Sequence, residues 1–219
     1  MTMAKAYRGV GMEGAIATWY ARNTGRDLSR FTRTAQLVAS QARPGSEILE
    51  VAPGPGYLAI ELAKRNYRVT TLDISRSFVR IARDNAAQAR LAIDVRHGDA
   101  AAMPFGEATF DVAVCVAAFK NFSDPIGALR EIHRVLRPGG QASIFDLRKD
   151  ATTAEIKDEV RRMHLSAWNS LLTRWTFNFV LLKRAYAREQ LERMASRSPF
   201  SRWDVAVEGI CVELRLIKA

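Results

Sequence analysis

The segment that most constrains the fold is a short apolar run that ends at a Pro/Gly-rich turn. It reads Ile48-Leu49-Glu50-Val51-Ala52-Pro53-Gly54-Pro55-Gly56-Tyr57. The run predicts a strand, its two glycines let a backbone approach a ligand closely, and a helix is expected to begin at Tyr57. The next apolar run ends in Asp73, which lies 19 positions after Gly54. That spacing is typical of the carboxylate that meets a ribose in a βαβ nucleoside site.

Strand and helix patterns then alternate along the middle of the chain. Strands are expected at 47–52, 68–72, 92–96, 110–116 and 141–147, and helices at about 57–65, 76–90 and 125–136. Strands separated by helical lengths predict a parallel sheet with right-handed crossovers. Ligands bind beyond the carboxyl ends of such strands, so four segments should converge on one crevice. These are residues 50–56, Asp73, Asp99 and residues 116–121.

Helical patterns flank this middle part, and a hairpin closes the chain. Helices are expected at 13–23, at about 28–42, at 153–175 and at 189–195, and two alternating runs at 204–207 and 211–217 predict the hairpin. We therefore expect a single domain over residues 1–219. Its predicted parts are an N-terminal helical cap (1–44), a cofactor-binding core (45–147), a helical substrate lid (148–200) and the closing hairpin (201–219).

Composition favours a globular protein of the cytoplasm. Hydrophobic residues make up 48% of the chain and charged residues 26%. No stretch is apolar enough to predict a membrane span, and the N-terminus lacks the apolar region of a secretory signal. Cys115 and Cys211 show no metal or redox spacing. Both fall in predicted strands, where we expect them to be small buried hydrophobes.

The net charge of +10 resides in the flanks of the chain. Residues 1–47 carry +4 and residues 148–219 carry +5, whereas residues 48–147 carry only +1. One interpretation is a face that attracts an acidic substrate, an anionic lipid or RNA. The alternative is a set of solvated helix faces, because the basic residues are dispersed rather than grouped in runs.

The glycine turn taken alone is compatible with several structures. It lacks the third glycine of a dinucleotide-binding fingerprint, since that position is Tyr57, and it lacks the Gly-Lys-Ser/Thr ending of a phosphate loop. Glu50 disfavours a phosphate and favours a ligand with an amino group or another positive charge. A purely structural strand-turn-helix remains the alternative.

Taken together, five segments resemble the class I S-adenosylmethionine-dependent methyltransferases over about residues 45–147. The segments are Glu50–Gly56, Leu72-Asp73, Gly98–Phe105, Phe110–Val114 and Arg134–Gly140. The first glycine of the family is Ala52 here, a residue small enough to admit the cofactor. The resemblance implies an α/β fold with a Rossmann-like, seven-stranded, mostly parallel sheet. Its last hairpin strand would be antiparallel, helices would cover both faces, and a helical lid would be added.

The resemblance also implies the cofactor S-adenosyl-L-methionine, with S-adenosyl-L-homocysteine as product, and assigns residues to it. Glu50 and the loop residues Ala52, Pro53, Gly54, Gly56 and Tyr57 would hold the methionine end. Asp73 would accept from the ribose hydroxyls, with Ile74 and Ser75 beside the adenine, which Asp99 and Ala100 would bind. Val116 and Ala117 would line the sulfonium side. The alternatives are a helix cap for Asp73 and an Asx turn for Asp99.

Within the superfamily, residues 115–125 look most like the quinone C-methyltransferases and their small-molecule relatives. Asn121 matches that group, whereas the segment after Asp146 does not follow it closely. No aspartate lies between Asp111 and Asn121, so no metal site of the catechol O-methyltransferase kind is predicted.

The acceptor is expected to be small and apolar or aromatic, because aromatic residues recur in the flanking helices. The predicted substrate lid comprises Met12, Trp19, Tyr20, Phe119, Trp168 and Trp175. Core packing is the alternative role for these side chains. In-line methyl displacement needs mainly positioning, which supplies roughly 7–11 kcal/mol in favourable cases. We see no dedicated nucleophile, and the candidates for a catalytic base or orienting group are His164, Tyr20 and Asn121.

Two other functions are compatible with the sequence. The basic flanks favour methylation of RNA or of a protein, although no dedicated nucleic-acid domain is recognisable. A non-catalytic cofactor-binding protein is the second alternative, for which Ala52 is the sequence feature. A lipid-like acceptor would imply peripheral contact with a membrane surface.

Overall fold

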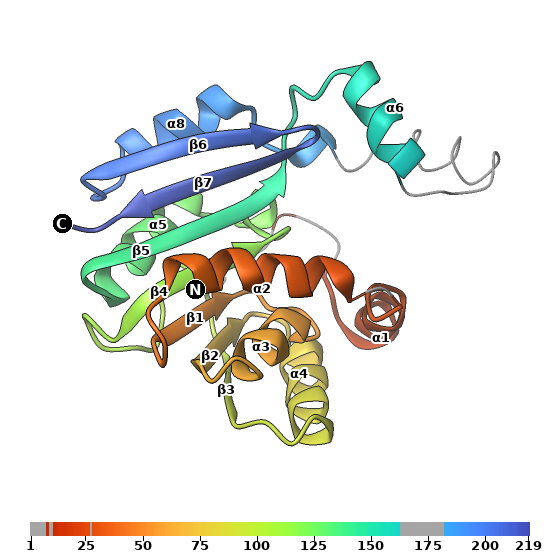
Figure 1. Cartoon of the computed structure of the whole chain (residues 1–219), viewed down its shortest axis with the longest axis vertical. Helices are drawn as coiled ribbons and strands as arrows, with labels where there is room; N and C mark the ends of the chain where they lie inside the picture. The colour runs from red at the N-terminus through yellow and green to blue at the C-terminus, as the bar shows by residue number, and fades with distance from the viewer. Residues whose placement is uncertain (1–7, 9–10, 27, 163–181) are drawn as a thin grey trace, which may run out of the picture.

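The computed structural model describes residues 8, 11–26, 28–162 and 182–219. At its centre is a seven-stranded sheet in the order β3-β2-β1-β4-β5-β7-β6 (Figure 1). The strands are β1 (Glu47–Val51), β2 (Arg68–Asp73), β3 (Ile93–His97), β4 (Phe110–Val116), β5 (Leu136–Leu147), β6 (Arg202–Glu208) and β7 (Cys211–Ile217). The strands β1 to β6 all run in one direction, and β7 runs antiparallel to both β5 and β6. The predicted mostly parallel sheet with an antiparallel strand in its closing hairpin is therefore confirmed.

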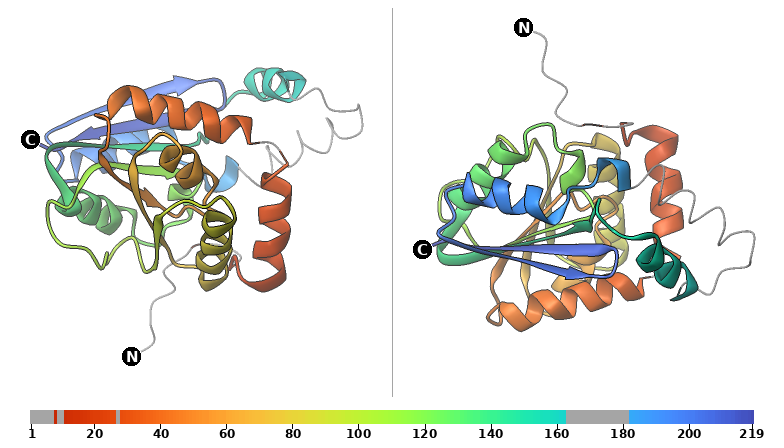
Figure 2. Two further views of the ribbon diagram at one scale, coloured as in Figure 1. Left: turned by 60° about the horizontal axis from the view of Figure 1, so that its bottom comes forward. Right: turned by 90° about the horizontal axis from the view of Figure 1, so that it is seen from above.

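Helices cover both faces of the sheet (Figure 2). One face carries α2 (Ser29–Gln41), α3 (Tyr57–Ala63) and α4 (Arg76–Gln88), and the other carries α5 (Pro125–Val135) and α8 (Arg188–Ser196). The central strands are buried from both sides: Ile48 of β1 faces the first layer and Leu49 faces the second. This two-sided burial explains why β1 reads as a continuous apolar run rather than an alternating one.

Short polar residues set the helix boundaries. The Ser75 hydroxyl accepts a hydrogen bond from the Phe78 N–H and so caps α4. Asp124 caps α5 through the Gly127 N–H, and Pro125 occupies the first helical position, where its missing N–H costs nothing. These caps fix where each helix leaves the carboxyl end of the preceding strand.

The structure departs from the sequence predictions at three places. β5 begins at Leu136, because that residue pairs with Phe110 before a register shift. Residues 188–196, assigned to the lid, form α8 and pack through Leu191 and Ala195 into the main core. Cys211, expected to be buried, is exposed at the start of β7, whereas Cys115 is buried as expected.

Two helices lie beyond the carboxyl ends of the strands, as both figures show (Figures 1 and 2). They are α1 (Gly14–Thr24) and α6 (Thr153–Arg162). The expected helix over 153–175 thus begins at the predicted position, and its part beyond Arg162 lies outside the described residues. The strand order reverses between β1 and β4, which makes this end of the sheet the expected ligand site.

Candidate functional site

Asp73, at the end of β2, is held in a fixed orientation by backbone donors. One carboxylate oxygen accepts the Ser75 N–H at 2.8 Å and the other accepts the Gly54 N–H at 3.0 Å. Burial raises the pKa of this carboxyl to about 6, although these hydrogen bonds oppose the shift. The helix cap of α4 is Ser75 rather than Asp73, so the cap alternative for Asp73 does not hold.

Glu50 lies on the neighbouring strand and is 3% exposed. Its oxygen Oε2 has no hydrogen-bond partner among the described residues. Burial raises the pKa of Glu50 to about 8, and the nearby Asp73 charge contributes in the same direction. A buried carboxyl with an unused oxygen is suited to a ligand that brings a positive charge or a hydrogen-bond donor.

The turn between β1 and α3 uses its glycines for two different purposes. At Gly54 (φ +55°) a Cβ would meet nothing closer than 4.0 Å, so this glycine leaves open space above the strand ends. At Gly56 (φ +80°) a Cβ would lie 3.1 Å from the Ala82 Cβ, so this glycine allows α4 to pack closely. Ala52 adopts φ 57°, a left-handed conformation that is strained for a residue with a side chain. Asn85 of α4 steadies the turn by donating to the Pro55 carbonyl at 2.9 Å.

Asp99 lies in the loop that follows β3. One carboxylate oxygen accepts the Ala101 N–H at 2.9 Å, which is the Asx turn considered as the alternative role. The neighbouring Ala100 N–H makes no hydrogen bond within the described part of the chain. The loop is fixed from α5: Glu131 accepts the Met103 N–H, and the Arg134 guanidinium donates to the carbonyls of Met103 and Phe105. No motif in the sequence pointed to Asn85 or Glu131, and Arg134 was noted only as the first residue of the segment Arg134–Gly140.

An ion pair that sequence reasoning missed joins the residues just after β4 to β5. The Lys120 ammonium lies 2.5 Å from a carboxylate oxygen of Asp146 on β5, and both side chains are less than 10% exposed. The same ammonium donates to the Ala117 carbonyl at 2.8 Å. Ala117 itself has φ 56°, and its N–H is used by the Phe145 carbonyl. The ion pair therefore fixes the strained residue that was predicted to line the sulfonium side.

The N-terminal segment is docked onto the start of α4. The Glu13 carboxylate accepts the N–H groups of Arg76 and Ser77 at 2.9 and 3.0 Å, and the Ser75 hydroxyl donates to the Met12 carbonyl at 2.5 Å. On the other side of α1, the Tyr57 hydroxyl donates to the Ala21 carbonyl at 3.0 Å. The Tyr57 side chain therefore positions α1, which leaves only its backbone for the predicted role in the cofactor loop.

The other predicted substrate-side residues have varied surroundings. The Tyr20 ring packs edge-on against Phe78, and Trp19 is 66% exposed on α1. Phe119, predicted to belong to the lid, is fully buried between Phe122 and Tyr186, so it supports the site from below rather than lining it. Asn121, at the end of the short 3-10 helix η1 (Phe119–Asn121), is half-buried. The remaining three, His164, Trp168 and Trp175, lie outside the described residues.

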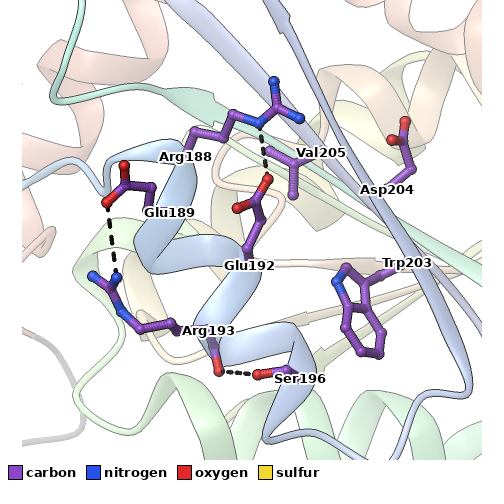
Figure 3. Close-up of a pocket in the computed structure, with 8 residues that line it drawn as sticks. All are labelled: Arg188, Glu189, Glu192, Arg193, Ser196, Trp203, Asp204 and Val205. Carbon is purple, nitrogen blue, oxygen red and sulfur yellow. Dashed lines mark hydrogen bonds and ion pairs between the residues drawn. The ribbon is translucent and has the colours of Figure 1, made fainter.

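Among the hollows of the described surface, two are of similar size. The larger, of about 490 Å³, lies between α8 and the edge strand β6 (Figure 3). Four of its charged side chains pair with one another, Arg188 with Glu192 and Arg193 with Glu189, and none of the predicted cofactor residues lines it. The second, of about 430 Å³, lies at the carboxyl end of β5 and includes Lys120. Of these two, the second includes a residue of the segment 116–121 that was predicted to reach the crevice.

Within the described ranges, no group of three or more His, Cys, Asp or Glu side chains is placed to hold a metal ion. No helix of the described part is both long and apolar enough to cross a bilayer.

The strand-end residues fit S-adenosylmethionine. Glu50 offers an unused acceptor for the ammonium of the methionine moiety, and Gly54 leaves open space above the turn. Asp73 is a fixed acceptor suited to ribose hydroxyls, and the Ala100 N–H, which no described residue accepts, is a donor suited to an adenine nitrogen. We therefore expect these residues to hold the cofactor.

Comparison with known proteins agrees with this geometry. Residues 49–144 match a family described as a methyltransferase domain. The chain is 34% identical over 121 residues to the demethylmenaquinone methyltransferase of Deinococcus radiodurans, covering 54% of this chain and 50% of that one. It is 32% identical over 146 residues to the 2-phytyl-1,4-naphtoquinone methyltransferase of Synechococcus elongatus, covering 64% and 62%. The matches thus span between half and two thirds of these relatives.

Solved structures support the fold. The chain resembles a putative S-adenosyl-L-methionine-dependent methyltransferase from Methanococcus maripaludis with a TM-score of 0.73 and 20% identity, covering 99% of this chain and 97% of that one. It also resembles a SAM-dependent methyltransferase from Aquifex aeolicus with a TM-score of 0.66 and 16% identity, covering 88% and 99%. Residues 49–144 therefore match the methyltransferase domain family, and the chain has the fold of the solved S-adenosylmethionine-dependent methyltransferases that it resembles.

Proposed function

We propose that this protein transfers the methyl group of S-adenosylmethionine to a small, apolar or aromatic acceptor by in-line displacement. One observation carries the proposal: Asp73 is anchored between the N–H groups of Gly54 and Ser75, beside Glu50 with its unused buried oxygen. Two carboxyls at neighbouring strand ends, under an open glycine turn, suit a ligand with ribose hydroxyls at one end and an ammonium at the other.

Positioning is the main contribution expected of the protein. The sulfonium of the cofactor supplies an electrophilic methyl group, so the chain need not supply a covalent nucleophile. Asp73 and Glu50 would orient the cofactor from below, while α1, docked through Glu13, would close the side of the crevice next to α4. Orienting two reactants in this way is worth roughly 7–11 kcal/mol in well-aligned intramolecular reactions.

The acceptor is proposed from the names of the matched relatives and from the part of the chain that lies beyond the family match. The matched relatives are named for demethylmenaquinone and 2-phytyl-1,4-naphthoquinone. The family match ends at residue 144, before the segments that flank the acceptor side. A reduced naphthoquinone is therefore the first acceptor to assay, followed by other small aromatic nucleophiles.

Calorimetry with S-adenosylhomocysteine tests the cofactor site. We expect the wild type to bind it and Asp73→Ala to bind at least about 10-fold more weakly, because a charge-assisted hydrogen bond typically contributes 1.5–3 kcal/mol. Asp84→Ala, on the exposed face of α4, is the matched control and should bind like the wild type. If the folded wild type takes up neither the cofactor nor its product, the proposed function is wrong.

A further inference from the structure

The 430 Å³ hollow at the carboxyl end of β5 is lined by four cationic side chains and by no carboxylate. Its lining residues are Arg8, Lys120, Lys149, Arg184, Ala185, Tyr186 and Gln190. They come from five separate parts of the chain: residue 8, η1, the loop after β5, the 3-10 helix η3 (Leu182–Arg184) with the two residues after it, and α8. The hollow is thus assembled only by the tertiary fold.

Three of the four cations lack an acidic partner among the described residues. Lys120 is neutralised by Asp146. The Arg8 guanidinium donates to the Ser123 carbonyl, and the Arg184 guanidinium donates to the Arg8 carbonyl at 3.5 Å. These contacts fix the two arginine side chains and leave their charges uncompensated. Lys149 forms no ion pair with any described residue. The neighbouring Asp150 pairs with Arg148 instead.

The side chain of Tyr186 contributes to the same wall. The Tyr186 hydroxyl is buried and has no hydrogen-bond partner within the described ranges. Burial raises the pKa of this phenol, so the group keeps its proton and remains a donor. Uncompensated cations that share a partly enclosed hollow repel one another, and an anion in the hollow would remove that repulsion.

The hollow adjoins the acceptor side of the crevice. Lys120 lines the hollow and also donates to the carbonyl of Ala117, the residue predicted to face the sulfonium. The predicted methionine end of the cofactor lies instead at β1, and β4 separates β1 from β5 in the sheet. Two strand spacings amount to about 10 Å, which separates the hollow from the methionine end.

We propose that this basic hollow binds an oxyanion group, a carboxylate or a phosphate, carried by the methyl acceptor. The inference rests on the proposed methyl transfer and adds the class of acceptor: a molecule with an apolar reacting end and an anionic end. Lys149 and Arg184 would contact the anion, together with Arg8.

Two small probes test the hollow without any methylation assay. Benzoate and phenyl phosphate are titrated at constant ionic strength, by calorimetry or by NMR, into the wild type and into Lys149→Ala/Arg184→Ala. The matched control is Arg80→Ala/Arg130→Ala, which removes the same charge from exposed positions on α4 and α5. S-adenosylhomocysteine affinity and thermal unfolding are measured for all three proteins.

The wild type should bind at least one probe, and the hollow variant should bind it at least about 10-fold more weakly, as expected for the loss of one or more charge-assisted hydrogen bonds. The control should stay within about two-fold, since distant surface charges are screened. Preference for benzoate would assign a carboxylate, and preference for phenyl phosphate a phosphate ester.

Three results would overturn the proposal: binding of neither probe, equal weakening in the control, or loss of S-adenosylhomocysteine affinity in the hollow variant alone. The last result would assign the cations to the carboxylate of the cofactor. Failure of the wild type to bind S-adenosylhomocysteine would count against the proposed function instead, because the probe titrations do not require the cofactor.

Discussion

At the scale of single residues, the candidate site contains a buried carboxyl and two strained backbone positions, and each of these lowers the stability of the fold. Burial keeps Glu50 largely protonated at neutral pH, and Ala52 and Ala117 adopt left-handed backbone conformations. Such strain clusters at functional sites when the surrounding structure enforces it. Each of these costs is testable by one substitution.

Glu50→Gln should stabilise the protein at high pH and weaken cofactor binding. The folded-state pKa of about 8 lies above the unfolded value of 4.5, so the wild type loses stability as pH rises from about 4.5 to 8. The neutral amide does not ionise, so its melting temperature should exceed that of the wild type increasingly over this window. Each 1 kcal/mol corresponds to about 2–4 °C for a chain of this size.

Differential scanning calorimetry from pH 5 to 9 checks the stability of Glu50→Gln, and titration with S-adenosylhomocysteine checks its binding. Glu107→Gln, at an exposed position, should show no such pH-dependent gain. A melting-temperature difference that does not widen with pH would contradict the assignment of a neutral, buried Glu50.

Ala52→Gly should relieve backbone strain. A left-handed conformation costs a residue with a side chain roughly 1–2 kcal/mol, which glycine avoids. Glycine also loses more conformational entropy on folding than alanine, which offsets roughly 0.5–1 kcal/mol of that gain. The free energy of unfolding in urea should therefore rise by up to about 1.5 kcal/mol. Ala87→Gly, on the exposed face of the helix α4, should do the opposite and lower it by up to about 1 kcal/mol. Equal losses in both variants would show that Ala52 is not strained.

At the scale of secondary-structure elements, the site depends on contacts that join elements far apart in the sequence. Glu13 fastens α1 to the start of α4, where the N-terminus of a helix also favours a negative charge. Glu131 and Arg134 of α5 hold the loop that carries Asp99. Lys120 and Asp146 join the ends of β4 and β5. The loops that meet in the crevice are thus fixed by neighbouring helices and strands.

Glu13→Ala should loosen α1 without unfolding the sheet. Two hydrogen bonds to N–H groups at the start of α4 are lost, and removal of such a cap costs about 0.5–2 kcal/mol. Hydrogen exchange should accelerate across α1 and remain unchanged in α5. Glu107→Ala, which removes a carboxylate elsewhere, should leave α1 as protected as in the wild type. Unchanged exchange in α1 would show that the Glu13 contact does not hold the helix.

At the scale of the whole molecule, the reversal of strand order brings separated segments to one end of the sheet. Addition of S-adenosylhomocysteine should therefore slow hydrogen exchange together in four segments: residues 52–56, 73–75, 99–102 and 116–118. The hairpin of β6 and β7, which contributes none of these segments, is the internal control. Protection of only one segment, or equal protection of the hairpin, would contradict a shared cofactor site.

The sequence by itself determined the order and type of the core elements and the carboxylates at their ends. Periodicity and turn residues are local signals, and right-handed crossovers then leave few topologies for the sheet. Asp73 and Glu50 were therefore found from their positions after apolar runs. The caps at Ser75 and Asp124 are similarly local.

Only the tertiary structure decided which charges are neutral, paired or uncompensated. The protonation of Glu50 follows from its burial, the pairing of Lys120 with Asp146 follows from the contact of η1 with β5, and the basic hollow unites residues as far apart as Arg8 and Arg184. It likewise placed residues 188–196 in the core rather than in a lid. Desolvation and Coulomb interactions depend on distances through space, which residue spacing along the chain does not encode.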